Sequence, residues 1–312
     1  MAPMARLRIG LIGWGTVGSA LGRLVAAGPL PLELACVAVR HPAAARGIPL
    51  PDGVAVVAPD DVAAARLDAV VELAGGTEEP LGWARTALAA GTAYVTANKA
   101  LLANHGDELS TLARQNDAAL LASASVGGGV PMLETVRHLA ATRAIGRLRG
   151  VLNATTTYML SAMGEGMTYG DALREAQAAG YAEADPSLDV DGRDAAQKLA
   201  ILASEAWGEW RSESQVERHG IRGLEVGEGQ VIRLVADATE ERLAVTPQEV
   251  EPDTPMAATA GIENLLEIDV RAGGIFRISG PGAGGRVTAG AVYADLARLV
   301  GGERPILFGG ST

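Results

Sequence analysis

The stretch LRIGLIGWGTVG, residues 7–18, decides the fold class of this chain. Leu7 to Ile12 is a short apolar run typical of a buried strand. The glycine-rich segment 13–18 follows with the spacing G-x-G-x-x-G, and a helical pattern and a second apolar run, 32–39, come next. Because the glycines join a strand to a helix within a β-α-β unit, they predict a dinucleotide-binding Rossmann fold.

Each glycine of this turn has its own expected role. Gly13 permits the tight turn, Gly15 lets the backbone approach a pyrophosphate, and Gly18 allows the helix to pack closely on the strand. The pyrophosphate would rest on the free N–H groups of the helix N-terminus, at Thr16 and Val17. A glycine turn without a ligand is the alternative, and the strand-turn-helix context argues against it.

The end of the second strand distinguishes between two cofactors. A site that prefers NAD places Asp or Glu there to bind the ribose 2′-hydroxyl. This chain has Val39-Arg40-His41 instead. Arg40 can pair bidentately with a 2′-phosphate, and no carboxylate is nearby to repel it. The sequence therefore predicts a preference for NADP, although some sites with Arg at this place also accept NAD.

Strand-like and helical segments keep alternating further along the chain. Lys99 follows the carboxyl end of one predicted strand and is expected to face the cofactor. A glycine run, 127–129, predicts a crossover into a second domain. The alternation predicts an α/β fold with a doubly wound parallel sheet, whose ligands bind at the carboxyl ends of the strands. The strand-like runs are 68–73, 93–96 and 118–122, and a helical pattern lies at 80–90.

Composition limits the class of protein. The chain has 312 residues, 48% hydrophobic and 20% charged, as expected of a globular protein of about two domains. The net charge of −11, with no basic stripe, argues against nucleic acid and anionic membranes as partners. There is no run of about 18 apolar residues and no signal-peptide pattern, so no membrane span is expected. The single cysteine, Cys36, excludes an internal disulfide and indicates a cytoplasmic location.

Only two of the 26 Lys and Arg residues are lysines, Lys99 and Lys198. An ammonium is compact and can exchange a proton, whereas a guanidinium stays protonated. The second lysine follows a loop that holds five carboxylates in the 12 positions 183–194. Asp194 and Lys198 are four residues apart on a predicted helix and share one face. A surface ion pair, worth only about 0.3–0.5 kcal/mol, would leave the acidic loop unexplained. An acidic pocket that holds an ammonium substrate beside Lys198 explains both features.

The chain resembles the homoserine dehydrogenases. The resemblance implies reversible oxidation of L-homoserine to L-aspartate 4-semialdehyde with NAD(P), within threonine and methionine biosynthesis. It also implies an N-terminal nucleotide-binding domain, a central α+β domain for catalysis and homodimerisation, and a C-terminal segment that returns to the first domain. The corresponding ranges are 1–128, 129–279 and 280–312. The motifs that carry the resemblance are 176–198 (AQAAGYAEADPSLDVDGRDAAQK), 71–76 (VELAGG), 96–102 (TANKALL), 280–284 (GPGAG) and the glycine turn 13–18.

The resemblance also implies roles for individual residues. Lys198 would be the proton donor and acceptor at the substrate oxygen, and Lys99 would sit beside the nicotinamide and assist the proton transfer. Three carboxylates would bind the substrate ammonium or hold Lys198, and two further residues would line the pocket. The carboxylates are Glu183, Asp189 and Asp194, the lining residues are Tyr181 and Thr155, and the additional cofactor contacts are Gly75, Gly76 and Gly282.

Three positions depart from the family pattern. Many members have Glu where this chain has Ser123, at the start of a sodium-binding loop. Only backbone carbonyls such as those of Val126, Gly128 and Val130 would remain as ligands, which argues against a bound sodium ion. The family loop Asn-Gly-Thr-Thr-Asn is changed by Ala154 and Thr157, whose side chains are expected to alter substrate fit or lower activity.

Several alternatives remain at the level of sequence. A related NAD(P)-dependent dehydrogenase of another small amino-alcohol or semialdehyde would use most of the same residues. A nucleotide-binding sensor without catalysis is a second alternative, although the Asp194–Lys198 pair argues against it. The homodimer would need apolar strands, for which 231–235 and 262–270 are candidates. The chain stops soon after the GPGAG motif, so we expect no regulatory domain and no feedback inhibition by threonine through one.

Overall fold

The computed structural model describes residues 6–39, 50, 53–141, 145–271 and 273–308. The chain divides into two compact units. The first unit comprises the described residues up to Gly129 and those from Gly284 to 308, and the second comprises the described residues of Val130–Ala283. The chain from Gly284 thus packs with the N-terminal part of the chain rather than with the residues that directly precede it.

The first unit contains one sheet of six parallel strands in the order β3-β2-β1-β4-β5-β6. This is the strand order of a Rossmann fold, in which the direction of progression reverses between β1 and β4. The predicted doubly wound parallel sheet is thus confirmed. The strands are β1 (Leu7–Ile12), β2 (Leu32–Ala38), β3 (Ala55–Val57), β4 (Ala69–Glu72), β5 (Ala93–Thr96) and β6 (Leu120–Leu121).

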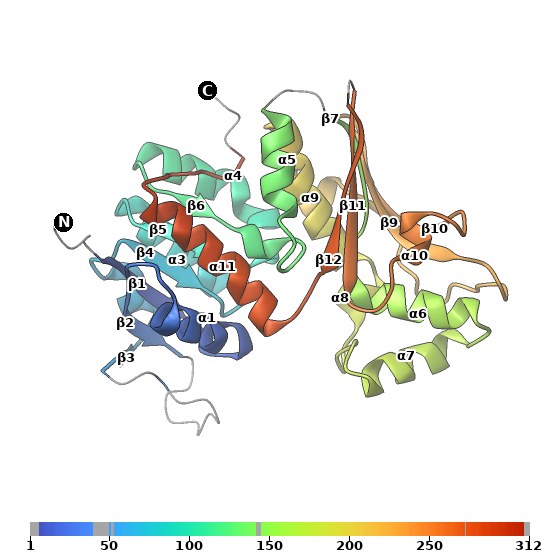
Figure 1. The fold of residues 1–312 in the computed structure, drawn as a ribbon, viewed down its shortest axis with the longest axis horizontal. Helices are drawn as coiled ribbons and strands as arrows, with labels where there is room; N and C mark the ends of the chain where they lie inside the picture. The colour runs from blue at the N-terminus through green and yellow to red at the C-terminus, as the bar shows by residue number, and fades with distance from the viewer. Residues whose placement is uncertain (1–5, 40–49, 51–52, 142–144, 272, 309–312) are drawn as a thin grey trace. The chain divides into compact units, whose positions relative to one another are not determined.

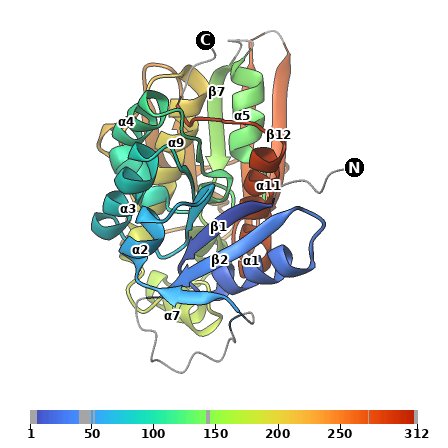
Figure 2. The same cartoon turned by 90° about the vertical axis from the view of Figure 1, so that its left-hand side faces the viewer.

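Helices cover both faces of this sheet (Figures 1 and 2). Alternate residues of the strands, such as Ile9 and Leu11, belong to one buried cluster with Leu21 of α1 and Leu296 of α11. The period of two sends the remaining strand residues to the other face, against α2, α3 and α4. The helices are α1 (Thr16–Ala27), α2 (Pro59–Ala64), α3 (Glu78–Ala89), α4 (Lys99–Gln115) and α11 (Gly285–Val300).

The second unit is built on a six-stranded, mostly antiparallel sheet in the order β12-β11-β7-β9-β10-β8. Helix α9 packs against β7, β9 and β10 and is buried along most of its length. The strands are β7 (Ile145–Val151), β8 (Glu217–Arg218), β9 (Ile232–Ala238), β10 (Leu243–Glu249), β11 (Glu263–Val270) and β12 (Gly274–Pro281). The helices are α5 (Met132–Ala140), α6 (Ala154–Gly164), α7 (Tyr169–Ala178), α8 (Ser187–Val190), α9 (Arg193–Trp207) and α10 (Pro255–Ala258).

The two segments expected to supply an apolar dimer surface, 231–235 and 262–270, largely form β9 and β11. Both strands lie inside the sheet, and most of their apolar side chains are buried within the unit. The large exposed apolar side chains of this sheet are instead Ile275 and Phe276 of the edge strand β12, which are 51% and 45% exposed. Among the described residues, no helix is long and apolar enough to cross a membrane.

Candidate active site

The glycine turn between β1 and α1 has the geometry of a nucleotide cradle. Gly13 has φ +106°, and a Cβ there would lie 2.8 Å from the backbone of Leu73. A Cβ on Gly18 would lie 2.0 Å from the carbonyl oxygen of Gly13. Gly15 differs, because a Cβ there meets nothing within 4 Å. Packing within the protein therefore does not require glycine at position 15. Glycine there instead leaves the helix N-terminus at Thr16 open to a ligand.

A cavity of about 320 Å³ opens beside this turn, lined by Gly13, Gly15, Ala38, Leu73 and Ala74 among others. It lies at the carboxyl ends of β1, β2 and β4, where open α/β sheets bind their ligands.

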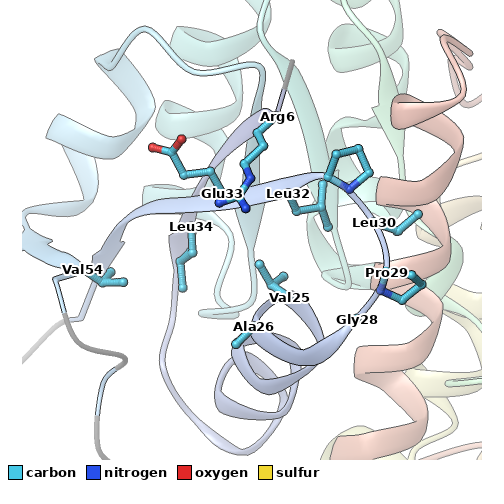
Figure 3. A pocket seen from close by; sticks show the side chains of 12 residues that line it. Arg6, Val25, Ala26, Gly28, Pro29, Leu30, Leu32, Glu33, Leu34 and Val54 are labelled. Carbon is cyan, nitrogen blue, oxygen red and sulfur yellow. The ribbon is translucent and has the colours of Figure 1, made fainter. Parts of the chain in front are cut away.

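A larger cavity of about 530 Å³ lies at the amino end of β2 (Figure 3). Its lining is mainly apolar, and its charged side chains are Arg6 and Glu33. The smaller cavity is favoured as the nucleotide site, because it lies at the carboxyl ends of the strands and beside the glycine turn.

The other residues of the first unit that are expected to contact the cofactor lie at the same end of the sheet. Gly75 and Gly76 follow β4 with φ of +69° and +90°. Lys99 is the first residue of α4, directly after Asn98, whose side chain caps the helix by accepting from the Leu101 N–H. Arg40 lies outside the described residues.

Gly282 belongs to the second unit and follows β12. A Cβ on Gly282 would meet the side-chain amide of Asn264 at 2.3 Å, so glycine is needed there for packing.

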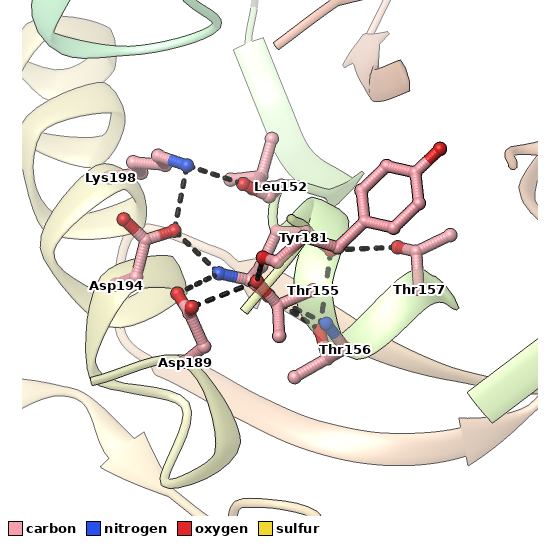
Figure 4. Close-up of polar contacts among 9 residues, drawn as sticks. Leu152, Thr155, Thr156, Thr157, Tyr181, Asp189, Asp194 and Lys198 are labelled. Carbon is pink, nitrogen blue, oxygen red and sulfur yellow. Dashed lines mark hydrogen bonds and ion pairs between the residues drawn. The ribbon is translucent and has the colours of Figure 1, made fainter. Parts of the chain in front are cut away.

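Lys198 lies in the second unit between two oxygen acceptors of different kinds (Figure 4). Its Nζ donates to Asp194 Oδ2 at 2.7 Å and to the backbone carbonyl of Leu152 at 2.6 Å. The two side chains are only 12% and 10% exposed, so this is not the solvated surface pair that the spacing alone would allow.

Asn153 joins the carboxylates of this cluster, although it was not among the site residues expected from the sequence. Its Nδ2 donates to Asp189 Oδ1 at 2.6 Å and to Asp194 Oδ2 at 2.9 Å. Its Oδ1 accepts from the Thr156 N–H at 2.8 Å, which makes Asn153 the N-cap of α6. The sequence signal for Asn153 was its place as the first residue of the family loop that Ala154 and Thr157 alter.

Asp189 completes the cluster and is partly shielded from water. The Thr155 hydroxyl lies 2.8 Å from Asp189 Oδ2 and 2.6 Å from the Tyr181 carbonyl oxygen. Burial, and next the charge of Asp194, raise the pKa of Asp189 above its ordinary value, against the hydrogen bonds from Asn153 and Thr155 and the charge of Lys198. The arrangement can bind a cationic group and can hold a proton at Lys198.

Two expected pocket residues are placed differently from this cluster. Glu183 is exposed, and within the described residues its carboxylate has no hydrogen bond or ion pair, while its backbone carbonyl accepts from Gln177. The Tyr181 ring stacks on Tyr158, with 4.6 Å between the ring centres, while its carbonyl meets Thr155. The structure therefore brings together Asp189, Asp194, Lys198 and Thr155, and leaves Glu183 at the surface.

The departures from the family pattern also have defined contacts. Ala154 is the first residue of α6, and the Thr157 hydroxyl donates to the Asn153 carbonyl at 2.8 Å. Ser123 is buried, and its N–H and hydroxyl both donate to Asp295 of α11, at 2.9 and 2.5 Å. The carbonyl of Val130 accepts from the Met132 N–H at 2.7 Å.

Comparison with known proteins identifies the family. The family model for homoserine dehydrogenase matches residues 131–297, and the model for the homoserine dehydrogenase NAD binding domain matches residues 13–122. The chain belongs to the homoserine dehydrogenase family. This membership makes it an NAD(P)-dependent oxidoreductase, and it confirms the resemblance on which the expected roles depend.

Individual relatives agree with this family. The homoserine dehydrogenase of Synechocystis sp. is 36% identical over 323 residues, which cover 95% of this chain and 73% of that relative. That of Lactococcus lactis is 33% identical, covering 96% and 75%. A crystal structure of homoserine dehydrogenase from Thiobacillus denitrificans has a TM-score of 0.87 at 32% identity, covering 95% of this chain and 74% of that one. A hyperthermophilic archaeal homoserine dehydrogenase in complex with NADPH has a TM-score of 0.87 at 30% identity, covering 96% and 99%.

Proposed function

We propose that this protein interconverts L-homoserine and L-aspartate 4-semialdehyde, with Lys198 as the proton donor and acceptor. The observation that carries this proposal is the buried Lys198–Asp194 pair, linked through Asn153 to Asp189. A family member without catalysis would have little use for an ammonium held out of water between two acceptors. The pair therefore argues against a nucleotide-binding sensor.

The chemistry of the cluster fits an alcohol–aldehyde reaction. In the reducing direction Lys198 donates a proton to the aldehyde oxygen, and in the oxidising direction its neutral amine takes the hydroxyl proton. A bound nicotinamide cofactor supplies the hydride donor or acceptor. Asp194 and the Leu152 carbonyl fix the position of Nζ during this exchange.

The remaining substrate contacts are assigned as follows. Asp189 and Asp194 attract the substrate ammonium, and Thr155 holds Asp189 in place. Lys99 assists the proton transfer beside the nicotinamide. Because Glu183 is exposed, its role in the ammonium site requires that the loop carrying it moves toward bound substrate.

For the cofactor, the glycine turn and the open space over Gly15 support binding of a dinucleotide pyrophosphate. We assign NADP as the preferred form because Arg40 stands where an NAD site would have an acid. Arg40→Asp should reverse the preference by removing a cation and adding repulsion. Side-by-side titrations in which wild-type protein binds NADH more tightly than NADPH would contradict this assignment.

We assign no sodium ion to the protein. Ser123 stands where many family members have Glu, and its hydroxyl, which donates to Asp295, brings no negative charge to a cation. Activity should be the same in sodium chloride and in choline chloride of equal ionic strength.

We further propose a cytoplasmic location, which the single buried cysteine supports. We also propose that the protein assembles as a homodimer through the second unit.

The decisive experiment is NADPH oxidation with aspartate semialdehyde, set against a panel of other small aldehydes. Aspartate semialdehyde should give the highest kcat/KM. A related dehydrogenase of another amino-alcohol or semialdehyde is the second candidate, because Ala154 and Thr157 alter the loop after Asn153. A higher kcat/KM with another aldehyde would favour it, and no turnover with any of them would sink both.

A further inference from the structure

Glu72 is a fully buried carboxylate at the edge of the sheet where the cofactor is proposed to bind. It ends β4, is 0% exposed, and lies between Ile12 of β1 and Thr96 of β5 in the strand register. None of the reaction steps above uses it.

Three donors converge on the two carboxylate oxygens of Glu72. Oε1 accepts from the N–H groups of Ala74 and Gly75 at 2.7 and 2.9 Å, and Oε2 accepts from the Thr96 hydroxyl at 2.7 Å. An ionised carboxylate can only accept hydrogen bonds, and all three of these partners are donors. In the described part of the chain no Lys, Arg or His forms an ion pair with it.

These contacts form part of a closed ring around the sheet edge. The Thr96 hydroxyl oxygen accepts from the Asn98 N–H at 2.9 Å, and Asn98 Nδ2 donates to the Gly76 carbonyl at 2.7 Å. Asn98 is also the N-cap of α4, the helix that Lys99 begins. Glu72 is therefore tied at one end to the 74–76 turn and at the other, through Thr96 and Asn98, to the backbone that carries Lys99.

The hydrogen-bonded ring does not by itself explain why residue 72 is a charged Glu. A glutamine could accept both backbone N–H bonds with its single oxygen, and it would avoid the cost of burying an ion without a counter-ion. A fixed negative charge at this edge is useful if a positive charge arrives there. The nicotinamide ring is positively charged in the oxidised cofactor and neutral in the reduced one.

We propose that Glu72 positions Lys99 and the 74–76 turn, and that its buried charge favours binding of the oxidised cofactor over the reduced one. This inference rests on the proposed function, because it presumes that a nicotinamide cofactor occupies the edge of the sheet. Glu72 acts through its neighbours and through its field, so it is a positioning residue.

The test compares dissociation constants of NADP⁺ and NADPH measured by titration calorimetry. Glu72→Gln should weaken NADP⁺ by at least about threefold more than NADPH, because only the oxidised ring loses an attraction. Glu78→Gln is the matched control, since it removes an exposed carboxylate from the first turn of the neighbouring α3 and should leave the ratio unchanged. An unchanged ratio in folded Glu72→Gln protein would overturn the electrostatic part of the inference.

Thr96→Val tests positioning without changing charge, and it remains informative if Glu72→Gln fails to fold. It removes the link from Glu72 to Asn98, so kcat should fall by at least about tenfold while the NADP⁺ to NADPH ratio of dissociation constants stays that of the wild type. A wild-type kcat would overturn the positioning role. If the wild-type protein itself binds neither cofactor, the proposed function fails rather than this inference.

Discussion

The two groups that accept hydrogen bonds from Lys198 have different roles. The Asp194 carboxylate pairs with the ammonium, whereas the Leu152 carbonyl directs Nζ without adding charge. A guanidinium could keep the contact with Asp194, but its planar fork does not deprotonate in proteins. Position 198 therefore requires a side chain that can form the ion pair with Asp194 and can also exchange a proton.

Lys198→Arg should therefore lose at least about 10²-fold in kcat, the usual effect of removing a positioned acid or base. Affinity for NADPH should change little, because we propose that NADPH binds at the glycine turn of the other unit. Steady-state kinetics together with NADPH titration measure both quantities. A near-normal kcat would mean that Lys198 is only an electrostatic anchor and that the proton travels through Lys99 or water.

The raised pKa of Asp189 has a pH signature. Burial and the charge of Asp194 keep a proton on Asp189 at a pH where an exposed Asp, with a pKa of 3.8, has lost it. Only the ionised form attracts an ammonium. As the pH is lowered, KM for homoserine should therefore begin to rise at a higher pH than it would if Asp189 had the pKa of an ordinary Asp. A KM that stays flat until pH reaches about 3.8 would contradict the assignment of Asp189 to the ammonium site.

The same shift affects stability with a definite sign. The folded protein holds the Asp189 proton more tightly than the unfolded chain does, so this group favours the fold at acidic pH. Its stabilising contribution is fully present below 3.8 and is lost as pH rises through the raised pKa of the folded state. Thermal melts in which Asp189→Asn loses this dependence would agree with the KM profile.

At the scale of elements, the β1–α1 turn separates packing from binding within six residues, 13–18. Gly15→Ala should leave the melting temperature unchanged, because its Cβ meets no protein atom within 4 Å, yet NADPH affinity should fall by about tenfold or more. Gly18→Ala should instead destabilise the fold, because its Cβ would lie 2.0 Å from the Gly13 carbonyl oxygen. Equal effects of the two substitutions on melting temperature would refute this division of roles.

The first unit was predictable from sequence because its central strands are largely buried on both faces, as β4 and β5 are along their whole length. Strand β5 has the predicted bounds, Ala93–Thr96, and β4 and β2 differ from the predicted runs by one or two residues. The second sheet was less visible, because β7 alternates charged residues such as Arg147 and Arg149 with buried ones and so shows no apolar run. Polar residues on an open face of the sheet interrupt the hydrophobic signal.

The candidate site was predictable only in part. The Asp194–Lys198 pair follows from helical spacing, whereas the Leu152 carbonyl leaves no trace in a sequence because every residue has one. Asn153 begins the family loop that Ala154 and Thr157 alter, but only the fold shows that Asp189 and Asp194 lie beside it. The exposure of Glu183 could not be foreseen from a loop in which acids are dense.

At the scale of the whole molecule, the sheet of the second unit carries a row of alternating charges across four strands. Asp237 of β9 pairs in register with Arg149 of β7, which is opposite Glu267 of β11, which is opposite Arg277 of β12. If a second copy of this row is laid against the first in the opposite direction, each charged residue faces a residue of opposite charge. Two copies related by a twofold axis would therefore be complementary along it, as an isologous interface requires. The exposed Ile275 of β12 lies beside the row and adds apolar area.

Light scattering at micromolar concentration should consequently give twice the chain mass of 31.9 kDa. Glu267→Arg should shift the protein toward monomers, because it sets cations against cations at the middle of the row. Glu228→Arg makes the same charge change on an exposed loop and should leave the dimer intact. If wild-type protein runs at the monomer mass, or if both variants dissociate alike, the sheet face is not the interface. A partner would then have to be sought at another surface of the second unit.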